Sequence, residues 1–301
     1  MTTQSTETRR SPEVLYKYLS PEGVRAVLGL RRLRFRAPRD FNDPCDGQLD
    51  PLHRLYTFEA ASARENEIRS ILSHGTPLRP GANPRMSAFY EKLTMLIDEL
   101  PRDLRDAQIA NAAKEIVEQN DLRQTGRNII DSINANRILC LSELATSMLM
   151  WSHYASGHRG AVLGFEPRTL IASTKALLWP VEYKNETPDV IDWAHYNICM
   201  VHGVQPNPPS TENARKLVLT KSREWEYEKE WRGAISAGPS ATTSHRDVEY
   251  SGNCLVELVR GIRTNDDDFE IWQSVAQEIS PSIRIRTAVL DVPTFSITIQ
   301  D

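Results

Sequence analysis

The stretch Tyr227–Ser236 has the sequence YEKEWRGAIS, which places two carboxylates, Glu228 and Glu230, one residue apart and ahead of an apolar run. We predict a strand here. Side chains two positions apart lie on the same side of an extended strand, so both carboxylates would face one side. The competing interpretation is a solvated helix end, because acids and bases alternate in this region. In a helix, however, Glu226 and Glu230 would form a like-charge pair, which slightly disfavours that interpretation.

The segments around this stretch predict short strands and helices in an irregular order. A strand at Val14–Tyr18 leads into a helix that starts at Pro21 after Ser20, and Gly29 is expected to end that helix. Further strands are predicted in RLRFRAP, NRILCLSE, GAVLGFEP, ALLWPVEYK, NCLVELVRGI, IRIRTAVLD and FSITI. Helices are predicted in SMLMWSHYA, VIDWAHYNICMVHGV, ENARKLVLTKSREW and DDDFEIWQSVAQEI. Strands and helices do not alternate regularly, so we predict an α+β fold with a compact mixed or antiparallel sheet.

Residues 52 to about 133 differ from the rest of the chain. They are rich in Ala, Glu, Arg, Ile and Leu at helical spacing, as in FYEKLTMLIDELP and AQIANAAKEIVEQNDL. We predict a helical insertion at about 52–133 within a single α+β domain that covers residues 12–301. The polar residues 1–11 are expected to be a disordered tail.

Composition excludes several classes of protein. The 301 residues suffice for a large buried core, and a net charge of -4 is unlike that of a chain that binds polyanions along its whole surface. No apolar run approaches the roughly 20 residues that would cross a bilayer, and the polar start is unlike a secretory signal. The four cysteines lie far apart without a CxxC pair, so we expect no disulfide scaffold and a cytoplasmic location.

Two groups of residues have side chains that could bind a metal ion. Asp43, Asp46 and Asp50 could hold a divalent cation, as nuclease carboxylates do, although a cluster of turn-forming aspartates is the favoured interpretation. His153 and His158 flank YASG at a spacing that suits a helix cap and a loop better than a metal site. We therefore predict no metal.

Four segments together resemble a known family. They are LYKYLS, FNDPCDG, ILCLSE…MLMWSHYASGHRGAVLGF and EWEYEKEWRG. They are similar to the bacterial family of domains of unknown function numbered 2971, in an order that runs from Leu15 to about Gly261. The helical stretch 52–133 carries none of the family's marks. The family name implies no activity.

A looser similarity is to the ADP-ribosyltransferases. In that fold an early strand with a polar or aromatic residue is followed by a helix, a strand with a hydroxyl, a helix with a tyrosine and a late strand with a Glu-x-Glu. Here LYKY precedes the helix from Pro21, CLSE supplies Ser142, MWSHYA supplies Tyr154, and YEKEWR supplies Glu228 and Glu230. Lys17 stands where that type carries arginine, and CLSE replaces Ser-Thr-Ser. The resemblance implies an ADP-ribosyltransferase-like fold and NAD as the substrate.

The expected site follows from that chemistry. Breaking the nicotinamide–ribose bond develops positive charge on the ribose, which a nearby carboxylate stabilises. We assign this role to Glu230, and the orientation or deprotonation of the incoming nucleophile to Glu228. Tyr16 and Tyr18 would stack on an aromatic base, with Lys17 pointing the other way. The other candidates for contact with the cofactor are Asn42, Asp43, Ser142, Trp151, His153, Tyr154 and Arg232.

The leading hypothesis is thus an enzyme that transfers ADP-ribose from NAD to a protein or nucleic acid, or hydrolyses NAD, as toxins and phage-defence effectors do. One alternative is a metal-dependent nuclease or phosphodiesterase that uses Asp43, Asp46 and a histidine. The other is a sensor or partner-binding domain without catalysis.

Overall fold

The computed structural model describes residues 12–48, 50–74, 99–119, 122–202, 211–238 and 242–301, together with the single positions 88, 92 and 95. The expected tail at residues 1–11 and part of the expected helical insertion lie outside the described residues. The described chain separates into two compact units, Met1–Asp46 with Asn134–Glu186 and Leu219–Asp301, and Gly47–Ile133 with Thr187–Val218. The expected insertion at about 52–133 lies in the second unit, which also takes in residues 187–218.

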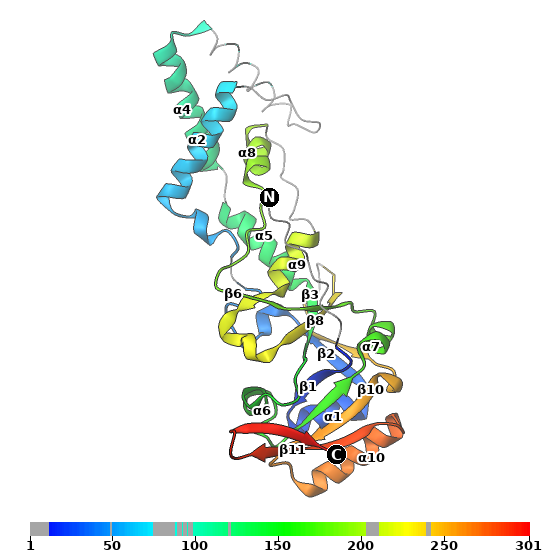
Figure 1. Cartoon of the computed structure of the whole chain (residues 1–301). Helices are drawn as coiled ribbons and strands as arrows, with labels where there is room; N and C mark the ends of the chain where they lie inside the picture. The colour runs from blue at the N-terminus through cyan, green and yellow to red at the C-terminus, as the bar shows by residue number, and fades with distance from the viewer. Residues whose placement is uncertain are drawn as a thin grey trace. The chain divides into compact units, whose positions relative to one another are not determined.

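The first unit is built on one large sheet (Figure 1). In the described part of the chain this sheet is 10-stranded, in the order β12-β11-β10-β4-β1-β3-β2-β9, with β8 paired to β3 and β5 paired to β8. Its strands are β1 Leu15–Leu19, β2 Arg32–Arg36, β3 Asn136–Ser142, β4 Ala161–Phe165, β5 Leu178–Pro180, β8 Glu230–Ser236, β9 His245–Glu249, β10 Leu255–Arg260, β11 Arg284–Asp291 and β12 Ser296–Gln300. The pairs are antiparallel except β10 with β11, which is parallel. The predicted α+β class with a mixed sheet is confirmed.

The sheet divides at β3. One edge of β3 pairs with β8 over its whole length, from Asn136 to Ser142. The other edge is shared, because Ser142 pairs with Tyr16 of β1 and Ile138 pairs with Arg36 of β2. Within the described strands, Cys140 lies between these two pairs and has no strand partner on that edge. We call this gap between β1 and β2 the fork.

Helices cover both faces of the sheet. They are α1 Pro21–Leu30, α6 Met148–Tyr154, α7 Pro167–Thr174 and α10 Asp266–Ile279. Along β4 the side chains alternate between the faces, so that Leu163 packs in a core with α1 and α10 while Val162 packs in a core with Trp151 of α6. This alternation of apolar residues toward both faces buries the centre of the sheet.

The first unit also contains a separate parallel pair of strands, β6 Glu182–Lys184 with β7 Thr220–Ser222. The short 3-10 turns are η1 Pro38–Asp40, η2 His53–Leu55, η3 Arg223–Glu228 and η4 Gly252–Cys254. Of these, η2 belongs to the second unit and the others to the first.

The second unit is helical in its described part. Its helices are α2 Phe58–His74, α4 Arg102–Gln119, α5 Leu122–Asn134, α8 Trp193–Val201 and α9 Thr211–Leu219. One core joins α2 and α4 through Ile68 and Ile109, and a second joins α5 to Tyr196 and Leu217. Among the described residues no helix has both the length and the apolar character needed to cross a membrane.

Several predicted boundaries were wrong. Gly29 does not end α1, which continues to Leu30, because Arg31 takes the left-handed position (φ 49°) and donates its backbone N–H to Leu28 O. The helix predicted in ENARKLVLTKSREW ends at Leu219, because Thr220–Ser222 pairs with β6 and this tertiary contact overrides helix propensity. The strands β7 and β9 and the helix α7 were not predicted.

Candidate functional site

The two carboxylates of the opening stretch are brought together by a turn. The prediction that Glu228 lies in the strand is wrong, because η3 ends at Glu228, Lys229 has a left-handed backbone (φ 44°), and β8 starts at Glu230. The Ser142 hydroxyl donates to the backbone oxygen of Glu228 at 2.6 Å and fixes this turn. The Glu230 amide donates to the hydroxyl of Tyr183 at 2.7 Å. The predicted convergence of the carboxylates therefore holds, although by a different backbone route.

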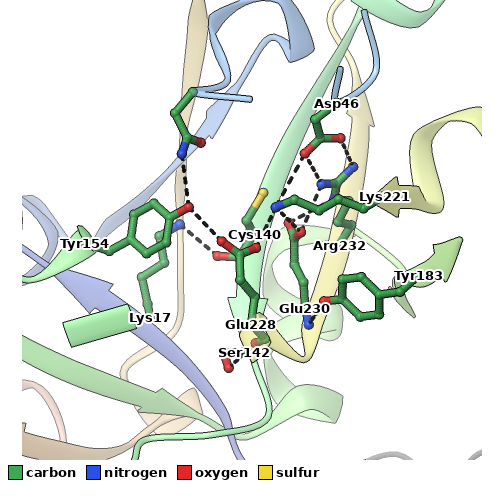
Figure 2. A network of polar contacts seen from close by, with 11 residues as sticks. Lys17, Asp46, Cys140, Ser142, Tyr154, Tyr183, Lys221, Glu228, Glu230 and Arg232 are labelled. Carbon is green, nitrogen blue, oxygen red and sulfur yellow. Dashed lines mark hydrogen bonds and ion pairs between the residues drawn. The ribbon is translucent and has the colours of Figure 1, made fainter. Parts of the chain in front are cut away.

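Two buried cations hold the carboxylates (Figure 2). Lys221 Nζ contacts Glu228 Oε2 at 2.5 Å and Glu230 Oε2 at 3.2 Å. The Arg232 guanidinium donates to both oxygens of Glu230 at 2.9 Å and to Asp46 at 2.8 and 2.5 Å. Glu228, Glu230 and Arg232 are 3%, 4% and 1% exposed, so water contributes little to their solvation and the side chains must satisfy one another.

The same network shifts the pKa values of the two carboxyls in opposite directions. Burial works against ionisation of Glu230, but the charges of Arg232 and Lys221 outweigh it and lower the pKa of Glu230 to about 2. Burial raises the pKa of Glu228, and the Glu230 charge adds to the rise, while Lys221 opposes it. Two acids held in one site with divergent pKa values are the arrangement that acid–base enzymes use to separate two roles.

Tyr154 extends the network away from Glu228. Its hydroxyl donates to Glu228 Oε1 at 2.7 Å and accepts from the Asn42 side-chain amide at 3.3 Å. Burial and the neighbouring Glu228 charge raise the pKa of Tyr154, so its hydroxyl stays protonated and remains a donor. Figure 2 shows Tyr154 reaching across to the carboxylate from α6, while Lys17 lies beneath it.

A cleft with a volume of about 150 Å³ opens onto these groups. Its lining residues are Tyr16, Lys17, Tyr18, Arg34, Arg36, Phe41, Asn42, Asp46, Ile138, Cys140, Leu141, Met150, Tyr154, Lys221, Glu228 and Glu230. The cleft lies at the fork, where Lys17 Nζ donates to the backbone oxygen of Cys140 at 2.8 Å. This lysine satisfies a carbonyl that no strand reaches.

Most of the residues predicted from sequence meet in this cleft. Those that line it are Tyr16, Lys17, Tyr18, Asn42, Tyr154, Glu228 and Glu230. Arg232 contacts it through Glu230 and Asp46. Tyr16 and Tyr18 pack in the same core, as expected for one face of β1, and the Tyr18 hydroxyl donates to Leu144 O at 2.7 Å. Lys17, which was expected to point away from them, lines the same cleft, because its side chain reaches the carbonyl of Cys140 at the fork.

Other residues predicted as site residues lie outside the cleft and contact the protein itself. Ser142 is 1% exposed and holds the turn rather than a ligand. Trp151 is fully buried, with its indole N–H donating to Ala145 O at 2.8 Å. His153 is exposed and contacts the Tyr154 and Tyr227 rings. These three residues and Asp43 are not among those that line the cleft.

The structure adds residues that sequence analysis missed. Lys221 was assigned to a helix, and its place in a short strand beside the carboxylates has no signal in the local sequence. Cys140 was passed over as an unpaired cysteine within a strand. Asp46 had been considered only as a metal ligand, yet it binds Arg232. A buried arginine two residues after Glu230 was the one available hint that another carboxylate completes the site.

The proposed metal ligands are engaged in other ways. The Asp43 carboxylate accepts from the Cys45 amide at 2.8 Å, as the turn interpretation predicted. Asp50 accepts from the Leu52 amide at 2.8 Å in the second unit. Within the described residues there is no cluster of three or more His, Cys, Asp or Glu side chains suited to a metal ion. The nuclease alternative therefore rests on the sequence alone.

Residues 150–233 match the family described as "Protein of unknown function (DUF2971)". This match supports the family that the sequence motifs indicated, and it runs from α6 into β8, with Tyr154, Lys221 and both glutamates inside it. No curated protein and no solved structure gives a significant match.

Proposed function

We propose that this cleft binds NAD and breaks the bond between nicotinamide and ribose, passing ADP-ribose to a macromolecule or to water. The observation that carries the proposal is the pair Glu228 and Glu230 in one cleft, bridged by Lys221, with Arg232 bound to Glu230 alone of the two. The opposite directions of their pKa shifts agree with this arrangement. Such pairs mark sites where one acid remains charged while the other exchanges a proton.

Each glutamate has a separate role. When the C–N bond breaks, the electron pair leaves with neutral nicotinamide, and the ribose becomes an oxocarbenium-like cation. Glu230, held ionised by Arg232 and Lys221, stabilises that cation. Glu228 accepts the proton of the attacking hydroxyl or water as the new bond to C1′ forms. Tyr154 orients the Glu228 carboxylate through its hydrogen bond.

The cleft also suits an aromatic ring. Tyr16, Tyr18 and Phe41 line it, and aromatic side chains stack on flat ligands in offset or edge-to-face geometry. A volume of about 150 Å³ is comparable to a cavity that holds one benzene ring. The nicotinamide ring therefore matches the enclosed part of the cleft, and the rest of the ligand would extend outward.

The strand register supports the resemblance to ADP-ribosyltransferases. Tyr16 of β1 pairs with Ser142 of β3, and Ser142 pairs with Glu230 of β8. The early strand, the strand with the hydroxyl and the late glutamate strand are therefore neighbours in the sheet, which brings the residues of the resemblance together. An activity of this kind would suit a toxin or a phage-defence effector.

The test is release of nicotinamide from NAD by the purified protein, with and without a cell lysate as a source of acceptors. We expect release by the wild type and a loss of about 100-fold or more in Glu228→Gln and in Glu230→Gln. Glu226→Gln is the matched control, because Glu226 is an exposed residue of the same turn. Dependence on lysate indicates transfer, and release without it indicates hydrolysis.

Two results would refute the proposal. One is the absence of nicotinamide release by folded wild-type protein under both conditions. The other is release at the wild-type rate by both Glu228→Gln and Glu230→Gln. In either case the glutamates would be members of a structural ion network only.

A further inference from the structure

Cations line the cleft from both of the strands that separate at the fork. Lys17 comes from β1, and Arg34 and Arg36 come from β2. The pairs that flank the gap, Tyr16 with Ser142 and Arg36 with Ile138, place one cation on each side of Cys140. Their positions are therefore set by the division of the sheet.

Lys17 has a neutral partner. Its ammonium donates to the carbonyl of Cys140 and, among the described residues, forms no ion pair within 4.0 Å. An ammonium carries three donors, so two remain for a ligand. The side chain is half-buried, and burial lowers the pKa of Lys17. Interactions with Cys140, Glu230 and Glu228 oppose this shift, and the Arg36 charge adds to it. A partly desolvated cation of this kind is stabilised by an anion.

Arg36 differs from Arg34, the other arginine of its strand that lines the cleft. Along β2, Arg32, Arg34 and Arg36 lie on the exposed face and alternate with buried Leu33 and Phe35. In the register with β9, Arg32 lies opposite Glu249 and Arg34 opposite Asp247, which it contacts with two hydrogen bonds of 2.9 and 3.2 Å.

Arg36, in contrast, lies opposite His245. In the part of the chain that the structure describes, Arg36 forms no salt bridge. Of the two arginines of β2 that line the cleft, Arg34 is thus paired with a carboxylate of β9, whereas Arg36 has no such partner among the described residues.

The other cations of the site are already engaged. Lys221 contacts Glu228 and Glu230, and Arg232 contacts Glu230 and Asp46. These two cations face three carboxylates, whereas Lys17 and Arg36 at the fork have no carboxylate of the described residues within ion-pair distance. The cleft therefore has an acidic side on β8 and a basic side at the fork.

We propose that the fork is an anion subsite, in which Lys17 and Arg36 bind a phosphate group of a nucleotide. The guanidinium of Arg36 can hold two phosphate oxygens, and Lys17 supplies a point charge from the opposite strand. The choice of a nucleotide rests on the proposed function, whereas the anion preference rests on the charges of the fork. A ligand bound this way places its phosphate at the fork and its ribose toward Glu228 and Glu230.

The test is calorimetric binding of ADP and of adenosine at low ionic strength. We expect ADP to bind the wild type more tightly than adenosine, and Arg36→Gln to weaken ADP binding about tenfold, the effect of losing one charge-assisted contact. Arg32→Gln is the matched control, since it removes the same charge from the same face of β2 outside the cleft. Adenosine binding should be the same in both variants. Lys17→Gln should weaken ADP binding as Arg36→Gln does.

The proposal is overturned if ADP binds the wild type no more tightly than adenosine, or if Arg36→Gln and Arg32→Gln bind ADP equally. ADP has no nicotinamide bond, so this result does not depend on catalysis. Binding of ADP through Arg36 without cleavage of NAD would leave the subsite standing and remove the proposed function. If the protein cleaves NAD but binds ADP equally well without Arg36, the proposed function stands and the anion subsite is refuted.

Discussion

Lys221 is the residue that connects the two carboxylates. It is 6% exposed and contacts Glu228 and Glu230. Burial favours loss of its proton, but the Glu230 and Glu228 charges prevail and raise the pKa of Lys221. A buried ammonium that remains charged needs at least one ionised partner, and Glu230, with Arg232 beside it, is the partner that stays ionised.

The two glutamates should therefore differ in their effect on stability. Glu230→Gln leaves the buried Arg232 short of a countercharge and should lower the free energy of unfolding at pH 7 by about 3–5 kcal/mol. Glu228→Gln removes a buried charge while its amide oxygen still accepts from Tyr154, and should cost about 1 kcal/mol. Urea denaturation measures both, with the exposed Glu226→Gln as a control near zero.

The pH dependence gives an independent check on the Glu230 variant. A lowered pKa means that the Glu230 carboxylate contributes stability above its unfolded pKa of about 4.3, and this contribution is lost as the pH falls toward 2. The difference in the free energy of unfolding between the wild type and Glu230→Gln should therefore become smaller as the pH falls over that range. Two results would contradict the assigned ionisation states. One is an equal loss of unfolding free energy in Glu228→Gln and Glu230→Gln at pH 7. The other is a difference between wild type and Glu230→Gln that does not change with pH.

At the scale of elements, the site depends on the close approach of β1 and β4. Gly160 precedes β4, and a Cβ atom there would lie 1.8 Å from the backbone oxygen of Leu19, the last residue of β1. Backbone atoms cannot move aside as a flexible side chain does. The absence of a side chain at Gly160 thus keeps the strand that carries Tyr16 and Lys17 in place.

We predict that Gly160→Ala lowers the free energy of unfolding by about 2 kcal/mol or more, because the added methyl group must displace β1. Gly29→Ala is the matched control. Gly29 lies in α1, and a Cβ there meets no other atom within 4 Å, so alanine should stabilise the helix by about 0.5–1 kcal/mol. Chemical denaturation of the two variants measures both changes in the free energy of unfolding. A Gly160→Ala protein as stable as the wild type would mean that β1 and β4 are not so closely packed.

Sequence patterns predicted most elements but not how they meet. The strand β3, the helix α6 and the capped start of α1 were predicted because their periodicity and turn residues are local signals. The position of Lys221 was not, because a pairing with β6 determines it. The prediction that Glu228 lies in a strand was wrong because the local sequence gives no sign of the turn at this point. The turn depends on a left-handed Lys229, a conformation that the residue type does not favour.

At the scale of the whole molecule, the cleft combines residues from five separated parts of the chain, 16–18, 34–46, 138–141, 150–154 and 221–230. The family match at residues 150–233 contains the carboxylate side, with Glu228 and Glu230, whereas the fork comes from β1, β2 and β3 outside that match. The motifs LYKYLS and ILCLSE supply Lys17 and Cys140 to the fork. The family segment alone therefore holds only part of the proposed site.

The division of labour between the two glutamates is the basis of the proposed chemistry, and a carboxyl ¹³C NMR titration of glutamate-labelled protein measures it directly. The spectra of Glu228→Gln and Glu230→Gln assign the two signals by their absence. Glu230 should remain ionised down to a pH of about 2, while Glu228 should titrate above the ordinary value of about 4.3. Two glutamates that titrate together near that ordinary value would contradict the assignment of an ionised stabiliser and a proton acceptor.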